Sequence, residues 1–262
     1  PVDIWDLQKL EKKTFKPKGG GSYGGDWGAA VVFSEDGTTV LAATSRELFC
    51  IDSITGVQNK QVEFDPRKGS IRCVVFSPNG KLVATESESE GRKMIAIWQA
   101  SDGTFLRFIE MDECYLESYR FSPDSKILAI GLCFRVKRGN GDNLSLWSVK
   151  NAKLISNSPV PARTWGLTFT SDGKQIVSVH NNLISSTADS GDQSVCFWDI
   201  SSPAEPIKRI VAPGIGSVSL SPSGKTIAWN CCGVTLRFLD IESGKETQAF
   251  DCLLYTSPSP RD

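Results

Sequence analysis

The side chains that could perform catalysis are few and scattered along the chain. The single histidine is His180, and the one G-x-S-x-G match, at residues 20–24, is followed by a strand-like run and not by the helix that a nucleophilic serine of this type requires. We therefore expect His180 to be structural or solvated. The acidic string ESESE at residues 86–90 lies in a polar stretch, where nothing would raise the pKa of a carboxyl group. The sequence predicts no catalytic residues.

A glycine-rich string, GGGSYG at residues 19–24, matches the pattern G-x-G-x-x-G. Phosphate binding by this pattern requires a strand before it and a helix after it, so that the helix N-terminus faces the phosphate. Here FKPK precedes the string and a strand-like run follows it. The pattern therefore predicts a flexible loop, and we expect no nucleotide and no other cofactor.

The cysteines do not form a metal-binding pattern. The chain has eight cysteines and one histidine, and no two cysteines have C-x-x-C spacing. A zinc site of Cys/His type cannot be assembled from this set, so we expect no metal. Free cysteine inside an apolar run behaves as a small hydrophobic residue. We favour a reducing compartment and a cytoplasmic location. The cysteines that lie in strand-like runs are Cys50, Cys73, Cys133 and Cys196.

The bulk composition is that of an ordinary globular protein. Of 262 residues, 40% are hydrophobic and 23% are charged, and the net charge is −1. A nucleic-acid platform would show a basic excess, and a membrane span needs about 18 consecutive apolar residues. Neither is found. We expect no nucleic-acid partner, no membrane insertion and no small-molecule substrate.

A short apolar strand followed by a turn recurs five times. Serine or threonine at the first turn position, proline at the second in three copies, and a final glycine or serine are typical of a type I hairpin turn. A second apolar run follows each turn. The five copies read VVFSEDG, VVFSPNG, YRFSPDS, LTFTSDG and VSLSPSG, and they end at Gly37, Gly80, Ser125, Gly173 and Gly224.

A third strand in each unit carries a tryptophan or an aliphatic residue near its end, and a more polar fourth strand follows. These positions recur every 41 to 51 residues, which is the period of a four-stranded propeller blade. An aspartate follows the position in several copies, including Asp199 and Asp240. The recurring positions are Trp5, Ile51, Trp98, Trp147, Trp198 and Leu239.

These motifs resemble the WD-repeat (WD40) family, most clearly in FSPNG, in IWQASDG and in the FWD of residues 197–199. The resemblance implies an all-β fold, a β-propeller of four-stranded antiparallel blades. It predicts a partial propeller over residues 1–251 and a ring of seven blades when intact. The expected units are a half blade at 1–16 and blades at about 27–64, 70–111, 116–160, 163–211 and 215–251.

The chain departs from the family in its buried polar residues. In the family, a Gly-His dipeptide ahead of the first strand supplies a histidine that joins an aspartate, a serine or threonine and the tryptophan in a hydrogen-bonded tetrad. No Gly-His dipeptide is present, and His180 does not match that position. Only Asp192, six residues before Trp198, matches the aspartate. We therefore expect the blades to depend mainly on apolar packing.

By the same resemblance, the chain is a non-catalytic scaffold for protein–protein interaction. In the family, the connections between second and third strands contribute to the face that binds partners, and here they are long at residues 86–93, 134–143 and 181–193. Ordinary solvated loops would have the same composition. The candidate partner-binding residues are Glu86, Glu88, Glu90, Arg135, Lys137, Arg138 and Asp189.

An alternative of a different class is an accessory propeller of a larger enzyme, a serine peptidase or a protein kinase. Its catalytic motifs would then lie outside this sequence. The last eleven residues, CLLYTSPSPRD at 252–262, resemble a translated sequencing adapter. We expect this tail to be non-native and the rest to be a fragment.

Overall fold

The computed structural model describes most of the chain in two compact units. One unit comprises Pro1–Leu116, Arg120–Leu128 and Leu146–Ile155, and the other comprises Glu117–Tyr119, Ala129–Ser145 and Ser156–Asp262. The described residues are 2–6, 11–15, 30–33, 37–43, 47–63, 70–89, 92–101, 103–111, 114–134, 143–160, 164–180, 194–211, 215–221, 223, 225–231 and 235–251.

Every regular element within these ranges is a β-strand. The N-terminal strands form one hairpin and two four-stranded sheets. The hairpin is β1 (Val2–Asp6) and β2 (Glu11–Phe15). The first sheet is β3 (Ala30–Phe33), β4 (Thr39–Ala43), β5 (Glu47–Asp52) and β6 (Gln58–Glu63). The second sheet is β7 (Ser70–Phe76), β8 (Leu82–Ser89), β9 (Arg92–Gln99) and β10 (Phe105–Glu110).

Three more four-stranded sheets follow. The third is β11 (Cys114–Phe121), β12 (Ile127–Phe134), β13 (Asn143–Ser148) and β14 (Leu154–Pro159). The fourth is β15 (Thr164–Phe169), β16 (Gln175–His180), β17 (Ser194–Asp199) and β18 (Lys208–Val211). The fifth is β19 (Ile215–Leu220), β20 (Thr226–Cys231), β21 (Thr235–Asp240) and β22 (Glu246–Asp251).

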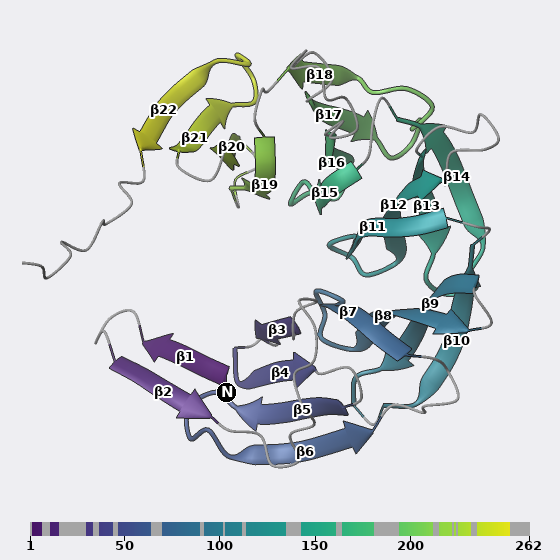
Figure 1. Cartoon of the computed structure of the whole chain (residues 1–262), viewed down its shortest axis with the longest axis vertical. Helices are drawn as coiled ribbons and strands as arrows, with labels where there is room; N and C mark the ends of the chain where they lie inside the picture. Colours follow the sequence, from purple (N-terminus) through teal and green to yellow (C-terminus); the bar gives the residue numbers. More distant parts are fainter. Residues whose placement is uncertain are drawn as a thin grey trace, which may run out of the picture. The chain divides into compact units, whose positions relative to one another are not determined.

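Each sheet holds four strands that pair in chain order, as Figure 1 shows for β7 to β10 and for β15 to β18. Neighbouring strands run antiparallel. Consecutive short connections are sufficient for this arrangement, because antiparallel neighbours can be joined by tight turns. The predicted all-β class and the five four-stranded antiparallel sheets are confirmed. The seven-bladed ring stays a prediction.

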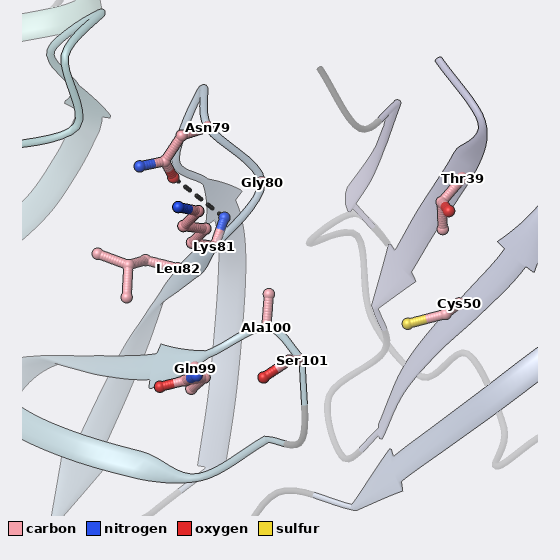
Figure 2. Close-up of a pocket in the computed structure, with 9 residues that line it drawn as sticks. All are labelled: Thr39, Cys50, Asn79, Gly80, Lys81, Leu82, Gln99, Ala100 and Ser101. Atoms are coloured by element: carbon pink, nitrogen blue, oxygen red, sulfur yellow. Dashed lines mark hydrogen bonds between the residues drawn. The ribbon is translucent and has the colours of Figure 1, made fainter. Parts of the chain in front are cut away.

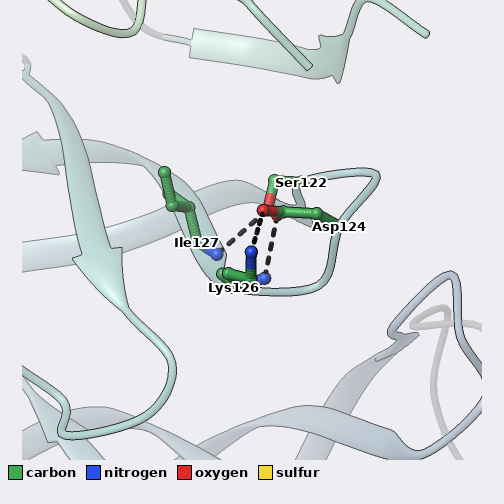
Figure 3. Close-up of polar contacts among 4 residues, drawn as sticks. All are labelled: Ser122, Asp124, Lys126 and Ile127. Atoms are coloured by element: carbon green, nitrogen blue, oxygen red, sulfur yellow. Dashed lines mark hydrogen bonds and ion pairs between the residues drawn. The ribbon is translucent and has the colours of Figure 1, made fainter. Parts of the chain in front are cut away.

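In the second to fifth sheets, the serine or threonine that opens the repeated motif accepts a hydrogen bond from the backbone N–H five residues later. In the third sheet, the Ser125 N–H donates to the Ser122 carbonyl at 2.8 Å. Ser122 Oγ donates to Asp124 Oδ1 at 2.7 Å and accepts from the Ile127 N–H at 2.9 Å (Figure 3). Asp124 Oδ1 also accepts from the Lys126 N–H at 3.1 Å. The motif therefore closes its own turn with local side-chain bonds.

The same turn recurs elsewhere with interchangeable residues. Its first-to-fourth backbone bond is 2.8 Å at 77–80 and 2.9 Å at 170–173. The fourth residue has a positive φ of 66° at Gly80, 68° at Gly173 and 62° at Ser125. A residue in this left-handed region matches the turn to the twist of the two strands, and glycine adopts it without strain.

The core of each sheet is its pair of central strands, which bury apolar side chains on both faces. In the second sheet Trp98, Val83 and Ala96 lie in one cluster, and Cys50 of the first sheet packs against it. A second cluster joins Val177 and Phe197 of the fourth sheet to residues of β20 and β21. Neighbouring sheets within each unit are therefore held by shared apolar surface rather than by strand pairing.

Candidate functional site

The first of the three expected loops is a strand hairpin. Glu86 and Glu88 belong to β8, where we expected a loop, and the pairing continues to Ser89 opposite Arg92. Glu86 is buried, with 6% of its surface exposed, and its Oε1 lies 2.7 Å from Lys93 Nζ. The placement of Glu86 in a solvated loop was wrong. Its carboxylate forms an ion pair within the hairpin.

The physical reason for this difference is a cross-strand arrangement of charges. Lys93 lies opposite Glu88 in the β8–β9 register and is therefore the diagonal neighbour of Glu86. The polar string ESESEGRK has the composition of a loop, but its alternation also fits a hairpin whose opposite charges face each other across the strands. Composition alone does not separate the two structures.

The remaining candidate partner-binding residues fall outside the described part of the chain. They lie in two sequence segments that join second to third strands, 135–142 between Phe134 and Asn143, and 181–193 between His180 and Ser194. Glu90 lies between β8 and β9. The residues concerned are Glu90, Arg135, Lys137, Arg138 and Asp189, together with the tetrad candidate Asp192.

The base of the 181–193 connection is a buried hydrogen-bond chain. Trp198 Nε1 donates to Ser178 Oγ at 2.6 Å, and Ser178 Oγ lies 2.7 Å from His180 Nε2. His180 Nδ1 lies 3.4 Å from Thr164 Oγ1. All four residues are 0% exposed. Because Ser178 accepts from the indole, its hydrogen can point to Nε2, which leaves the Nδ1 hydrogen of a neutral His180 for Thr164.

His180 therefore has a structural role. It extends the hydrogen-bond chain of Trp198, and it does so from a position in the sequence that we did not expect. It is the last residue of β16, two residues after Ser178, and not part of a Gly-His dipeptide. In the sequence, His180 does not match the family's histidine because it follows the second strand of its unit instead of preceding the first. Alternation along β16 places Ser178 and His180 on one face of the strand, and that signal was available.

A simpler version of the same contact occurs in the second sheet. Trp98 Nε1 donates to Thr85 Oγ1 at 2.8 Å, and both residues are buried. Trp147, at the same position of the third sheet, is half-buried, and Trp5 lies in β1. Apolar packing is thus supplemented by a buried indole hydrogen bond in the second and the fourth sheets.

The two residues that flank segment 181–193, His180 and Ser194, are fixed by strand pairing in the fourth sheet. His180 pairs with Ser194 at the end of the β16–β17 ladder, and both are fully buried. Thr164 also approaches the neighbouring strand β12 closely, because a Cβ added at Gly131 would lie 2.6 Å from Thr164 Cβ. The ends of segment 181–193 are therefore rooted in a rigid, tightly packed frame.

The aspartates after the tryptophan position close the turns at the opposite end of the sheets. Asp199 Oδ1 accepts from the Ser201 hydroxyl at 2.6 Å and from its N–H at 2.8 Å, which holds the pKa of Asp199 below its usual value. Asp240 Oδ1 accepts from the Ser243 N–H at 2.8 Å and its hydroxyl at 2.7 Å, and its pKa is lowered likewise. Both residues act in turn formation.

The described residues offer neither a metal cluster nor a membrane helix. Within them, no group of three or more His, Cys, Asp or Glu side chains is arranged to hold a metal ion. A helix long and apolar enough to cross a membrane is also absent from the same ranges. The glycine-rich string at 19–24 lies outside them.

Comparison with known proteins identifies the repeat. Residues 59–105 match the family model "WD domain, G-beta repeat" (WD40). No curated protein matches the sequence. Among solved structures, a chain of Kuenenia stuttgartiensis hydrazine synthase is similar with a TM-score of 0.63 and 14% identity, over 87% of this chain and 68% of that one. The likeness concerns the fold alone.

The matched segment does not coincide with one sheet. It begins in β6, the fourth strand of the first sheet, and ends at Phe105, where β10 begins. It therefore joins the last strand of one sheet to the first three strands of the next, so that a single repeat takes part in two sheets. The chain carries a WD40 repeat within an all-β fold built from the four-stranded blades of a β-propeller.

Proposed function

We propose that this chain is a non-catalytic scaffold that binds a protein partner through the connections between its second and third strands. WD40 domains are typically used for protein interaction, and residues 59–105 match that family. The observation that carries the proposal is the buried hydrogen-bond chain at the base of segment 181–193. It provides a rigid root for a connection of thirteen residues, the longest between the second and third strands of any sheet here.

A fixed root is what a binding loop needs. Ordering a long loop on binding opposes affinity through lost conformational entropy, and a loop whose two ends are held already loses less. His180 and Ser194 are paired and fully buried, so both ends of the segment are set before any partner arrives. Binding loops presented by a rigid frame are common in proteins.

Charge supports a protein partner over other classes. Arg135, Lys137 and Arg138 lie in the segment of the third sheet, and Asp189 lies in that of the fourth. Two segments of opposite sign suit a partner surface with complementary charges, and such complementarity directs the orientation of binding. The proposal includes a cytoplasmic location, which the free thiols of Cys50 and Cys196 support.

A loop replacement tests this proposal. In the full chain, residues 181–193 are replaced by Glu-Gly, the pair that joins β8 to β9, while His180 and Ser194 are kept. A partner captured by the wild type is identified by mass spectrometry, purified and titrated against both proteins. We expect the replacement to weaken its binding about tenfold or more, because the central contacts of an interface dominate its energy.

The matched control is placed at the other end of the sheets. The variant Lys153→Glu/Lys245→Glu changes two exposed lysines of turns between third and fourth strands. We expect it to bind like the wild type, and all three proteins to share one melting temperature within a few degrees. A partner that tolerates the loop replacement but is lost with the control variant would place the interface at the wrong end and overturn the proposal.

A further inference from the structure

A basic side chain on the fourth strand of one sheet reaches the next sheet. Arg107 of β10 donates from Nη1 to the carbonyl oxygen of Val149 at 2.7 Å and also to that of Lys150. Both acceptors belong to the turn after β13 of the third sheet. The contact joins the second sheet to the third by a charge-assisted hydrogen bond.

The fourth sheet repeats this contact at equivalent atoms. Lys208 of β18 donates from Nζ to the carbonyl oxygens of Ile241 and Glu242, the latter at 3.1 Å, in the turn after β21. We name such a contact a latch. In the third sheet a serine makes a related contact at a different acceptor, because Ser158 of β14 donates to the Pro203 carbonyl, which lies later in the turn after β17.

The acceptors of the two basic latches occupy the same places in the same kind of turn. Each turn is closed by a bond from the N–H of its fifth residue to the carbonyl of its first, at 2.9 Å for Ala152 to Ser148 and for Gly244 to Asp240. The second and third carbonyls of such a single helical turn have no donor within it, and cations satisfy them well.

The donors also share a register. Arg107 lies opposite Ile97, and Lys208 lies opposite Phe197. Each of these partners directly precedes the tryptophan position of its sheet. In the first sheet, the residue at this place is Lys60, which lies opposite Cys50, directly before Ile51. The repeat therefore places a third cation where the other two form latches.

The corresponding acceptors exist in the second sheet. Its turn after β9 is closed in the same way, by the Gly103 N–H donating to the Gln99 carbonyl at 2.9 Å. The equivalent second and third carbonyls are those of Ala100 and Ser101. Lys60 itself is exposed, whereas Arg107 and Lys208 are half-buried.

A cavity lies between Cys50, the cross-strand partner of Lys60, and the residues that carry these acceptor carbonyls. It has a volume of roughly 500 Å³, and its lining includes Cys50 on one side and Gln99, Ala100 and Ser101 on the other. Figure 2 shows the Cys50 sulfur pointing toward the turn that carries Ala100 and Ser101. Cys50 packs against the apolar cluster of the second sheet, but among the described residues no hydrogen bond like those of Arg107 and Lys208 joins Lys60 to the turn after β9.

We call the contact surface between two neighbouring sheets a seam. We propose that the seam between the first two sheets opens and closes, and that Lys60 is its latch, donating to the carbonyls of Ala100 and Ser101 when the seam is closed. The closed seam covers the Cys50 thiol, and the open seam presents the cavity to solvent. Lys60 thereby sets how this pair of blades is spaced, as Arg107 and Lys208 do for theirs.

The reaction rate of Cys50 with N-ethylmaleimide measures the opening. Burial raises the pKa of the Cys50 thiol, and the nearby Lys60 charge lowers that pKa. In the full chain, Lys60→Met removes the latch and the charge together. Loss of the charge alone would raise the pKa and slow the reaction, because the thiolate is the nucleophile. We expect instead about fivefold faster labelling, from the loss of a latch bond.

Two variants complete the test, with labelling at Cys50 followed by peptide mass spectrometry. Lys60→Arg keeps a donor of similar reach and is expected to label within about twofold of wild type. Lys153→Met removes an exposed lysine from another turn and should leave the rate unchanged. Cys196, which is 0% exposed, serves as the internal control for global unfolding. The proposal would be overturned if Lys60→Met were labelled no faster than the wild type, or if Lys60→Arg were labelled as fast as Lys60→Met.

Discussion

The second and fourth sheets use the same tryptophan position in different ways. Trp98 donates a hydrogen bond to Thr85 and lies in an apolar cluster. Trp198 donates to Ser178, which continues to His180 and Thr164. Strand β16 ends at His180, which belongs to this longer hydrogen-bond chain, and the longest connection between second and third strands, residues 181–193, follows it directly. The connection between β8 and β9 has only two residues. The additional buried hydrogen bonds of the fourth sheet therefore accompany the long connection that they anchor, and they are not a sign of a core that is stronger throughout.

The largest expected loss of unfolding free energy follows from removing the buried tryptophan, in the second and the fourth sheet alike. Trp98 and Trp198 are 1% and 0% exposed, so Trp98→Ala and Trp198→Ala each leave a large cavity. We expect either change to lower the free energy of unfolding by about 3–5 kcal/mol, as measured by urea denaturation. A loss below about 1 kcal/mol in one of them would show that its sheet contributes little to the cooperative unit.

Removing the hydroxyl that each indole contacts should separate the two sheets. Thr85→Val leaves one buried N–H without its acceptor, and we expect it to cost about 1–3 kcal/mol. Ser178→Ala removes a partner from Trp198 and from His180 at once, so it should cost about 2–4 kcal/mol. Chemical denaturation of both variants tests this order. Equal losses would mean that the His180 contact adds nothing to the fourth sheet.

The smallest effect concerns acid. The pKa of Asp199 is lowered by its bonds from Ser201, so its stabilising contribution is complete above the ordinary carboxyl pKa of about 3.9 and is lost as the pH falls through the lower folded value. Asp199→Asn should flatten the fall of melting temperature between pH 5 and pH 2.5. Gln99→Asp, at the equivalent turn position of the second sheet, should steepen it. A Gln99→Asp profile that overlies the wild type would contradict this.

The turns and strands were predictable from the sequence because their stabilising contacts are local. Ser122, Asp124 and Lys126 bond within five residues of each other, so the motif FSPDS specifies its own turn. Alternation and the 41-to-51-residue period then predict four strands per unit, and the WD40 match at 59–105 contains the second of the five copies of the turn motif. The tryptophan position was recognised from its place near the end of each third strand and from its spacing.

Three features depended on contacts between distant residues. Whether ESESE is a loop or a hairpin was decided by Lys93 lying across the strand from it, and composition is blind to that pairing. His180 became part of a tryptophan network because β15, β16 and β17 bring Thr164, Ser178 and Trp198 around it. The latches of Arg107 and Lys208 join residues more than thirty positions apart.

The strands, the tight turns, the four-stranded period and the family of the repeat follow from the sequence, because each is specified within a window of a few tens of residues. The three-dimensional packing of the chain sets which polar groups are buried together, which turn carbonyls receive a cation from the neighbouring sheet, and which connection is anchored at both ends. Those outcomes require groups far apart in sequence to meet inside a low-dielectric core, where an unpaired donor or acceptor is costly and a partner is therefore found.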